Sequence, residues 1–240
     1  MRVSYVCKLF GAVLAQHERI PEELTKFRYF AERDKDGWGL AHYKGNHLLI
    51  TKSTRSALLD RKYVTAVKKV EGPLIVAHLR FMTRGNLRKV NTHPFTFDKY
   101  VFAHNGTVDI SSLADYLRGK YKKLKGTTDS EVLFHFLIQS MEKYGNFMGL
   151  RKAVKEISKV ARERHVTSIN FLMSDGMYLY AYKRVYRGPN NLFYNNKKGF
   201  YKSILFASRP MDEGWTEMEN GEFLMIDSRD LSMVKTFIRE

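Results

Sequence analysis

The feature that most constrains the fold is a series of short apolar runs, some of them joined in pairs by tight turns. Residues 38–51 and 168–183 each contain two such runs, separated by Lys-Gly-Asn at 44–46 and by Asp-Gly at 175–176. Tight turns join antiparallel strands, because parallel strands need a long crossover connection. The predicted strands cover residues 7–15, 38–43, 47–51, 73–79, 100–104, 168–174, 177–183, 203–207, 222–227 and 233–238.

Helix signals are grouped between these strands. Pro21 before two glutamates fits a first helical turn, where acids face the positive end of the helix dipole. Thr128 and Glu131 form a capping box, in which Thr128 caps the helix and Glu131 bonds back to it. We expect further helices over residues 56–70, 112–117, 130–143 and 150–164. This grouping predicts an α+β fold rather than a doubly wound parallel sheet.

The chain's size and composition favour one domain. It has 240 residues, of which 44% are hydrophobic, so it can bury a sizeable core. The sequence has no low-complexity linker, and we expect residues 1–240 to form a single domain. Residues 187–199 are polar and are expected to form a mobile loop.

The single cysteine, Cys7, excludes several classes of protein. An intramolecular disulfide and a zinc site with two or more thiolates are both ruled out. Dinucleotide and P-loop motifs are missing, so we expect no cofactor and no metal. The chain lacks an apolar stretch of membrane-spanning length and a signal-peptide run, so we expect a cytoplasmic protein with no membrane partner.

The formal net charge of +16 allows a polyanionic partner. The basic residues are densest at 120–125 and 151–164. A solvated lysine-rich surface is the more ordinary interpretation. Binding of nucleic acid is the alternative, but the sequence has none of the common nucleic-acid-binding motifs to support it.

Six short segments carry the functional signal, although each alone has an ordinary structural explanation. Cys7 could be a small buried hydrophobe, Asn105-Gly106 a hairpin turn, and Arg80 a surface charge. The six segments are residues 7–11, 36–39, 77–85, 91–95, 102–106 and 128–131.

In this order the segments resemble the class II glutamine amidotransferases, which belong to the N-terminal-nucleophile (Ntn) hydrolase superfamily. Residues 206–210, Trp215 and residues 221–224 resemble the later part of the stand-alone YafJ-like branch. The resemblance covers nearly the whole chain. It implies a four-layer αββα sandwich, in which two antiparallel sheets lie between helical layers.

The resemblance also implies a reaction and its catalytic residues. Ammonia is released from the side-chain amide of glutamine through a γ-glutamyl thioester on Cys7. The side-chain amide of Asn105 and the backbone N–H of Gly106 are the implied donors to the oxyanion, which preorganised donors stabilise.

Three further residues are implied to hold the substrate. Arg80 resembles the arginine that pairs with the α-carboxylate, Asp129 the carboxylate that receives the α-ammonium group, and Thr83 an additional hydrogen-bonding residue. Arg84 stands where synthase-linked members commonly have histidine, and we name it only as a neighbour of the site.

The family mechanism conflicts with the six residues before Cys7. An N-terminal cysteine supplies its own base, because an α-amino group has a pKa near 8. Within this chain the nitrogen of Cys7 is an amide, which cannot act as a base. Residues 1–6 are a propeptide, or the start is misassigned and lies at Val6, or activity has been lost.

The sequence therefore predicts an amidohydrolase that releases ammonia from glutamine, with an acceptor that the sequence does not name. A separate synthase subunit is the expected partner for the ammonia. Another γ-glutamyl amide is the alternative substrate. The rival from a different class is an inactive, basic binding module on the same fold.

Overall fold

The structure is a computed structural model that describes residues 7–16, 18–32, 34–82, 86–108, 111–161, 166–198 and 202–238. Its helices are α1 (Pro21–Arg28), α2 (Arg61–Val67), α3 (Ser111–Ala114), α4 (Asp129–Tyr144) and α5 (Asn146–Ala161). Three short 3-10 helices are η1 (Tyr29–Glu32), η2 (Lys89–Asn91) and η3 (Gly119–Lys122). In the part of the chain that is described, no helix is both long enough and apolar enough to cross a membrane.

The first sheet is built around the strand that follows Cys7. Its strands are β1 (Lys8–Leu14), β2 (Trp38–Lys44), β3 (His47–Ser53), β4 (Leu74–Leu79), β9 (Phe193–Lys197), β10 (Ser203–Ala207) and β11 (Thr216–Glu217). Their order across the sheet is β11-β9-β10-β1-β4-β2-β3. Every pairing is antiparallel, so β1 has β4 on one side and β10 on the other.

The second sheet carries the Asn105 segment. Its strands are β5 (Phe95–Phe97), β6 (Tyr100–Asn105), β7 (Asn170–Ser174), β8 (Tyr178–Tyr182), β12 (Glu222–Asp227) and β13 (Met233–Phe237). Their order is β13-β12-β8-β7-β6-β5, and all pairs are again antiparallel. Strand β6 therefore lies beside β7, with Asn105 opposite Asn170.

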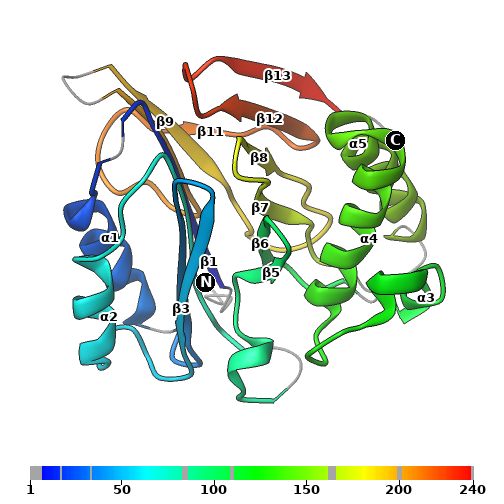
Figure 1. Cartoon of the computed structure of the whole chain (residues 1–240), viewed down its shortest axis with the longest axis horizontal. Coiled ribbons are helices and arrows are strands. Elements are labelled where there is room, and N and C mark those ends of the chain that lie inside the picture. Colours follow the sequence, from blue (N-terminus) through cyan, green and yellow to red (C-terminus); the bar gives the residue numbers. More distant parts are fainter. Residues whose placement is uncertain are drawn as a thin grey trace.

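The two sheets and the helices form four layers (Figure 1). Helices α1 and α2 lie outside the first sheet, and α3, α4 and α5 lie outside the second. Between the sheets, a third apolar cluster includes Leu9, Val76 and Leu172. The predicted αββα sandwich is confirmed. Strand β1 is buried along its whole length, which explains its almost continuous apolar sequence.

Several local predictions are confirmed. The turn at 44–46 joins β2 to β3, and α1 begins at Pro21 as expected. The Thr128 hydroxyl accepts the Glu131 N–H at 3.3 Å, as a helix cap should. The prediction that the Glu131 side chain bonds back to Thr128 is wrong. The Glu131 carboxylate accepts the N–H groups of Lys125 and Gly126 instead.

Three predicted segments differ from the structure. The helix expected over residues 56–70 covers only Arg61–Val67, because Asp60 accepts the Lys62 N–H at 3.0 Å and caps the helix there. Helix α5 begins at Asn146 rather than at residue 150. The mobile loop expected at 187–199 contains strand β9, which pairs with both β10 and β11.

Leu172 tests how much the contact between the two sheets contributes to stability. Its side chain is fully buried and packs over Gly11 of β1, where an added Cβ would lie 2.9 Å from the Leu172 methyl carbon. We expect Leu172→Ala to lower the free energy of unfolding by about 2–5 kcal/mol, measured by urea denaturation. Leu59→Ala, at a side chain that is 76% exposed, is the control and should change it by less than about 0.5 kcal/mol.

Candidate active site

Cys7 lies at the beginning of β1, next to the end of β4. Lys8 pairs with Leu79, and this register brings Cys7 beside Phe81. The Cys7 Sγ donates to the Phe81 carbonyl at 3.2 Å and accepts the Phe81 N–H at 3.3 Å. The thiol is therefore held by backbone groups, whose positions follow from the pairing of the two strands.

The environment of Cys7 keeps the thiol protonated at neutral pH. Burial raises the pKa of the Cys7 thiol to about 11. The Phe81 backbone, Lys8 and Arg80 oppose this rise, and the Asp34 carboxylate adds to it. Asp34 forms an ion pair with Lys8 at 3.2 Å. Because the thiolate is the nucleophilic form of cysteine, chemistry at Cys7 needs a base.

Asn105 ends β6, and Gly106 continues in a conformation that favours glycine. The φ angle of Gly106 is +154°, and an added Cβ would lie 2.0 Å from the Ser168 carbonyl oxygen. The Ser168 hydroxyl donates to the Asn105 carbonyl at 2.9 Å. These contacts fix the backbone, so a substitution at Gly106 would displace the segment.

Ser208 connects Asn105 to strand β1. The Asn105 side-chain amide donates to the Ser208 hydroxyl across 3.5 Å, and the same hydroxyl accepts the Leu9 N–H at 2.8 Å. Ser208 directly follows β10, which pairs with β1. It belongs to one of the segments singled out in the sequence, but nothing there indicated that it would contact Asn105.

Asp129 is the first residue of α4 and lies half-buried at the helix N-terminus. Its Oδ2 accepts the Val108 N–H at 2.8 Å, and its Oδ1 accepts the Ser130 N–H at 2.8 Å. These bonds orient the carboxylate and tie α4 to the segment after Gly106. A carboxylate has about four lone-pair positions, so Asp129 retains capacity for a cationic group.

Arg80 directly follows β4 and is 3% exposed. Its guanidinium donates from Nη1 to the Asn86 carbonyl at 3.2 Å. Arg80 and Cys7 line the same cleft, and the positive charge of Arg80 opposes the rise in the pKa of the Cys7 thiol.

One small cleft brings together residues that are far apart in the chain. Among the predicted site residues, Cys7, Arg80, Gly106 and Asp129 line it. Its volume is about 20 Å³, which is room for about one water molecule. Asn105 is not among the residues that line the cleft, and its side-chain amide contacts Ser208. Thr83 and Arg84 lie outside the described residues.

Histidines form part of the wall of the cleft, and they lie in the segments singled out in the sequence, which assigned them no role in the site. His93 and His104 line it, and the ring of His93 stacks on that of His78 with centroids 4.2 Å apart. Burial lowers the pKa of His78 to about 3 and that of His93 well below its ordinary value. Both rings are therefore neutral at physiological pH and act as packing groups.

His104 holds a defined position between two serines. Its Nε2 lies 3.2 Å from the Ser168 carbonyl, so this nitrogen is the donor, and its Nδ1 accepts from the Ser130 hydroxyl at 3.0 Å. Burial lowers the pKa of His104 as well. Within the described ranges, no group of three or more His, Cys, Asp or Glu side chains could hold a metal ion.

Comparisons with known proteins identify the family of the chain. The model of the family "Glutamine amidotransferases class-II" matches residues 6–208. An uncharacterized protein of Methanocaldococcus jannaschii is 28% identical, over 94% of this chain and 70% of that protein. The Escherichia coli protein "Putative glutamine amidotransferase YafJ" is 30% identical, over 62% of this chain and 60% of that protein.

Solved structures share the fold. Glutamine phosphoribosylpyrophosphate amidotransferase from B. subtilis superposes with a TM-score of 0.73 at 19% identity, covering 97% of this chain and 49% of that chain. A class II glutamine aminotransferase domain protein from Silicibacter pomeroyi gives a TM-score of 0.72 at 19% identity and covers 98% and 100% of the two chains. With its family match over residues 6–208 and its Ntn-type sandwich, the chain belongs to the class II glutamine amidotransferases.

Proposed function

We propose that this protein releases ammonia from the side-chain amide of glutamine through a thioester on Cys7. One observation carries the proposal: the only cysteine of the chain shares a small cleft with Arg80, Gly106 and Asp129. The thiol is the nucleophile, and the three partners supply a cation, an oxyanion donor and an anion. Binding a free amino acid amide requires a cation and an anion for its two charged α-groups, and cleaving its amide bond requires an oxyanion donor.

The base in this proposal is the α-amino group of Cys7 itself, in a form of the protein that begins at Cys7. Support comes from the thiol, whose pKa of about 11 makes a base necessary. The rings of His93 and His104 are poor candidates, because burial lowers their pKa values. The family match begins at residue 6, directly before Cys7.

The proposed reaction forms a thioester on Cys7 and then hydrolyses it. The amine takes the thiol proton, and the sulfur forms a bond with the side-chain carbonyl carbon of glutamine. The carbon–nitrogen bond then breaks, and the amine returns the proton to the departing ammonia. Water hydrolyses the thioester, which gives glutamate and restores the thiol.

Asn105 and Gly106 would stabilise the oxyanion in each tetrahedral intermediate. The Asn105 amide has a long 3.5 Å contact with Ser208, which it can exchange for a developing negative charge. Gly106 allows close approach of the substrate to its N–H, because it carries no Cβ.

Substrate recognition is proposed to rest on two opposite charges. Arg80 would bind the α-carboxylate and Asp129 the α-ammonium group, with Thr83 adding a hydrogen bond and Arg84 as a neighbour. In the full chain the cleft of about 20 Å³ holds about one water molecule, which is less room than glutamine needs.

A separate synthase subunit is the proposed acceptor of the ammonia, and another γ-glutamyl amide is the alternative substrate.

We also propose that the whole chain forms one domain. Strands β12 and β13 lie beyond the family match in sequence, and they complete the second sheet.

The role of the N-terminal amine can be tested by comparing two forms of the protein. One is the full chain, and the other begins at Cys7 after removal of an initiating methionine, which intact mass verifies. We expect the Cys7 form to hydrolyse glutamine at least about 100-fold faster, because a positioned base contributes about 10²–10⁴-fold. Equal rates in the two forms would contradict the amine as base.

The nucleophile can be tested in the form that begins at Cys7. Cys7→Ala should abolish glutamine hydrolysis and labelling by an electrophilic glutamine analogue, while the melting temperature stays within a few degrees. Cys7→Ser is the control for shape, because it retains a weaker nucleophile of similar size. Activity of Cys7→Ala near the unsubstituted level would rule out a cysteine mechanism.

The oxyanion role of Asn105 predicts an effect on kcat. Asn105→Ala should lower kcat by about 100- to 1,000-fold, or about 3–4 kcal/mol in the transition state, with a smaller change in KM. Asn220→Ala, at an exposed asparagine, is the matched control and should leave kcat unchanged. A large rise in KM with unchanged kcat would instead assign Asn105 to substrate binding.

A further inference from the structure

A second, much larger cavity lies next to the catalytic cleft. Its volume is about 870 Å³, which is within the usual range for small-molecule sites. The same two segments contribute to both spaces: Val90 and Glu131 line the cavity, whereas Asn91 and Asp129 line the cleft.

The walls of this cavity are strongly basic. Six lysines line it against two acids, Asp98 and Glu131. The lysines come from strand β3, helix α2, the 3-10 helices η2 and η3, and the segment before α4, so only the fold gathers them. They are Lys52, Lys62, Lys89, Lys120, Lys123 and Lys125.

The acids compensate only part of this charge, because six lysines face two lining carboxylates. The Glu131 carboxylate already accepts the backbone N–H groups of Lys125 at 2.8 Å and Gly126 at 2.7 Å. Asp98 lies 3.9 Å from Lys120, which also pairs with Glu142 at 3.0 Å.

The other lysines at the rim lack such partners. For the part of the chain that the structure describes, no ion pair involves Lys62, Lys89, Lys123 or Lys125. Gathering like charges around a concave surface raises the local potential and favours an anion inside it.

Lys52 places a positive charge at the inner wall. Its Nζ donates to the Thr92 carbonyl at 2.7 Å and lies 5.4 Å from the centre of the Phe95 ring. Burial lowers the pKa of Lys52 to about 8, with Glu131 opposing and Lys125 adding to this shift. A bound anion would stabilise the charged form of this lysine.

Aromatic surface accompanies the lysines. Phe95 and Phe97 line the cavity, and Phe97 stacks on Tyr121 with centroids 5.6 Å apart. An apolar wall beside a ring of cations suits a ligand that has both an organic body and several negative charges. Lysines act as point charges toward phosphate and do not need the planar geometry that arginine prefers.

We propose that this cavity binds a phosphorylated small molecule of nucleotide size that carries two or more phosphate groups. The proposal does not depend on glutamine hydrolysis, because binding can be measured on the Cys7→Ala variant of the full chain.

The test is isothermal titration calorimetry of the Cys7→Ala chain with three probes, ATP, inorganic tripolyphosphate and adenosine, at about 150 mM salt. We expect ATP and tripolyphosphate to bind and adenosine not to bind. The double charge reversal Lys123→Glu with Lys125→Glu should weaken ATP binding by at least about tenfold, since two cations are replaced by anions.

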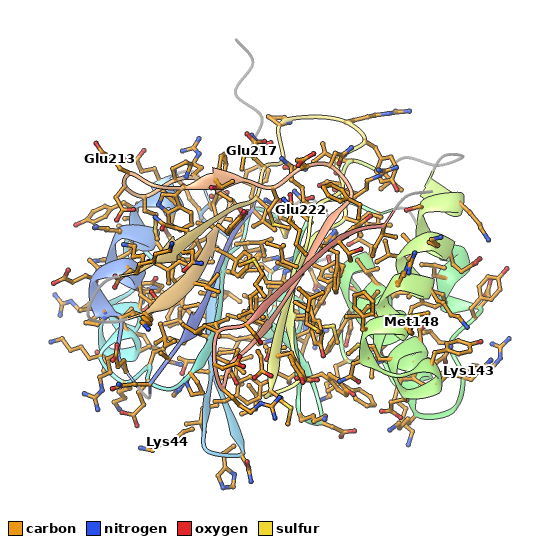
Figure 2. The ribbon with its side chains drawn as sticks, turned by 90° about the horizontal axis from the view of Figure 1, so that it is seen from above. Lys44, Lys143, Met148, Glu213, Glu217 and Glu222 are labelled. Atoms are coloured by element: carbon orange, nitrogen blue, oxygen red, sulfur yellow. The ribbon has the colours of Figure 1, made fainter. Side chains whose placement is uncertain are left out.

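Lys143 and Lys152 provide a matched control. They line a different cavity of about 520 Å³ on the helical layer, and Figure 2 shows Lys143 at the outer side of the helix pair. The same double reversal there should change the Kd for ATP by less than about twofold. If the cavity variant fails to fold by circular dichroism, Lys123→Gln with Lys125→Gln replaces it, with a smaller loss of affinity expected.

Three results would overturn the proposal. The first is no binding of ATP or tripolyphosphate at millimolar concentration. The second is an equal loss of affinity in the cavity and control variants. The third is tight binding of a single-stranded RNA by a chain that does not bind ATP, which would identify the basic surface as a nucleic-acid site.

Discussion

The pairing of β1 between β4 and β10 is the constraint on which the rest of the structure depends. Backbone hydrogen bonds hold β1 on both sides, and both of its faces are buried. This register sets Cys7 beside Phe81 at the end of β4, and Leu9 beside Ser208 after β10. A shift of one residue would turn every side chain of β1 to the opposite face, so the position of the thiol and the packing of the core are fixed together.

The second sheet completes the site because it packs against the first. Strand β6 delivers Asn105 and Gly106 to the end of β1, and Ser208 bridges the two sheets. Helix α4 then supplies Asp129, whose bond to Val108 attaches the outer layer to the same point. The geometry of the candidate site is thus a product of layer packing, in which the two sheets and the layer of α4 each contribute different groups.

Local sequence predicted the parts of this structure that local chemistry determines. The turn residues at 44–46 predicted the β2–β3 hairpin, and Thr128 predicted the start of α4. Strand β9 was missed because its polar sequence becomes a strand only through long-range pairing with β10 and β11. The order of the motifs indicated Cys7, Arg80, Asn105, Gly106 and Asp129. The contacts of Ser208 and the convergence of six lysines join distant segments, and only the fold reveals them.

The solitary sulfhydryl has a practical consequence for work on this molecule. With one cysteine in 240 residues, a mercury atom, a fluorinated tag or a fluorophore attached to sulfur would report from the cleft alone, without prior removal of competing thiols. Its pKa of about 11 makes the reaction with such reagents accelerate toward alkaline pH. The residue that defines the proposed chemistry therefore also gives the protein a built-in attachment point for spectroscopy and phasing.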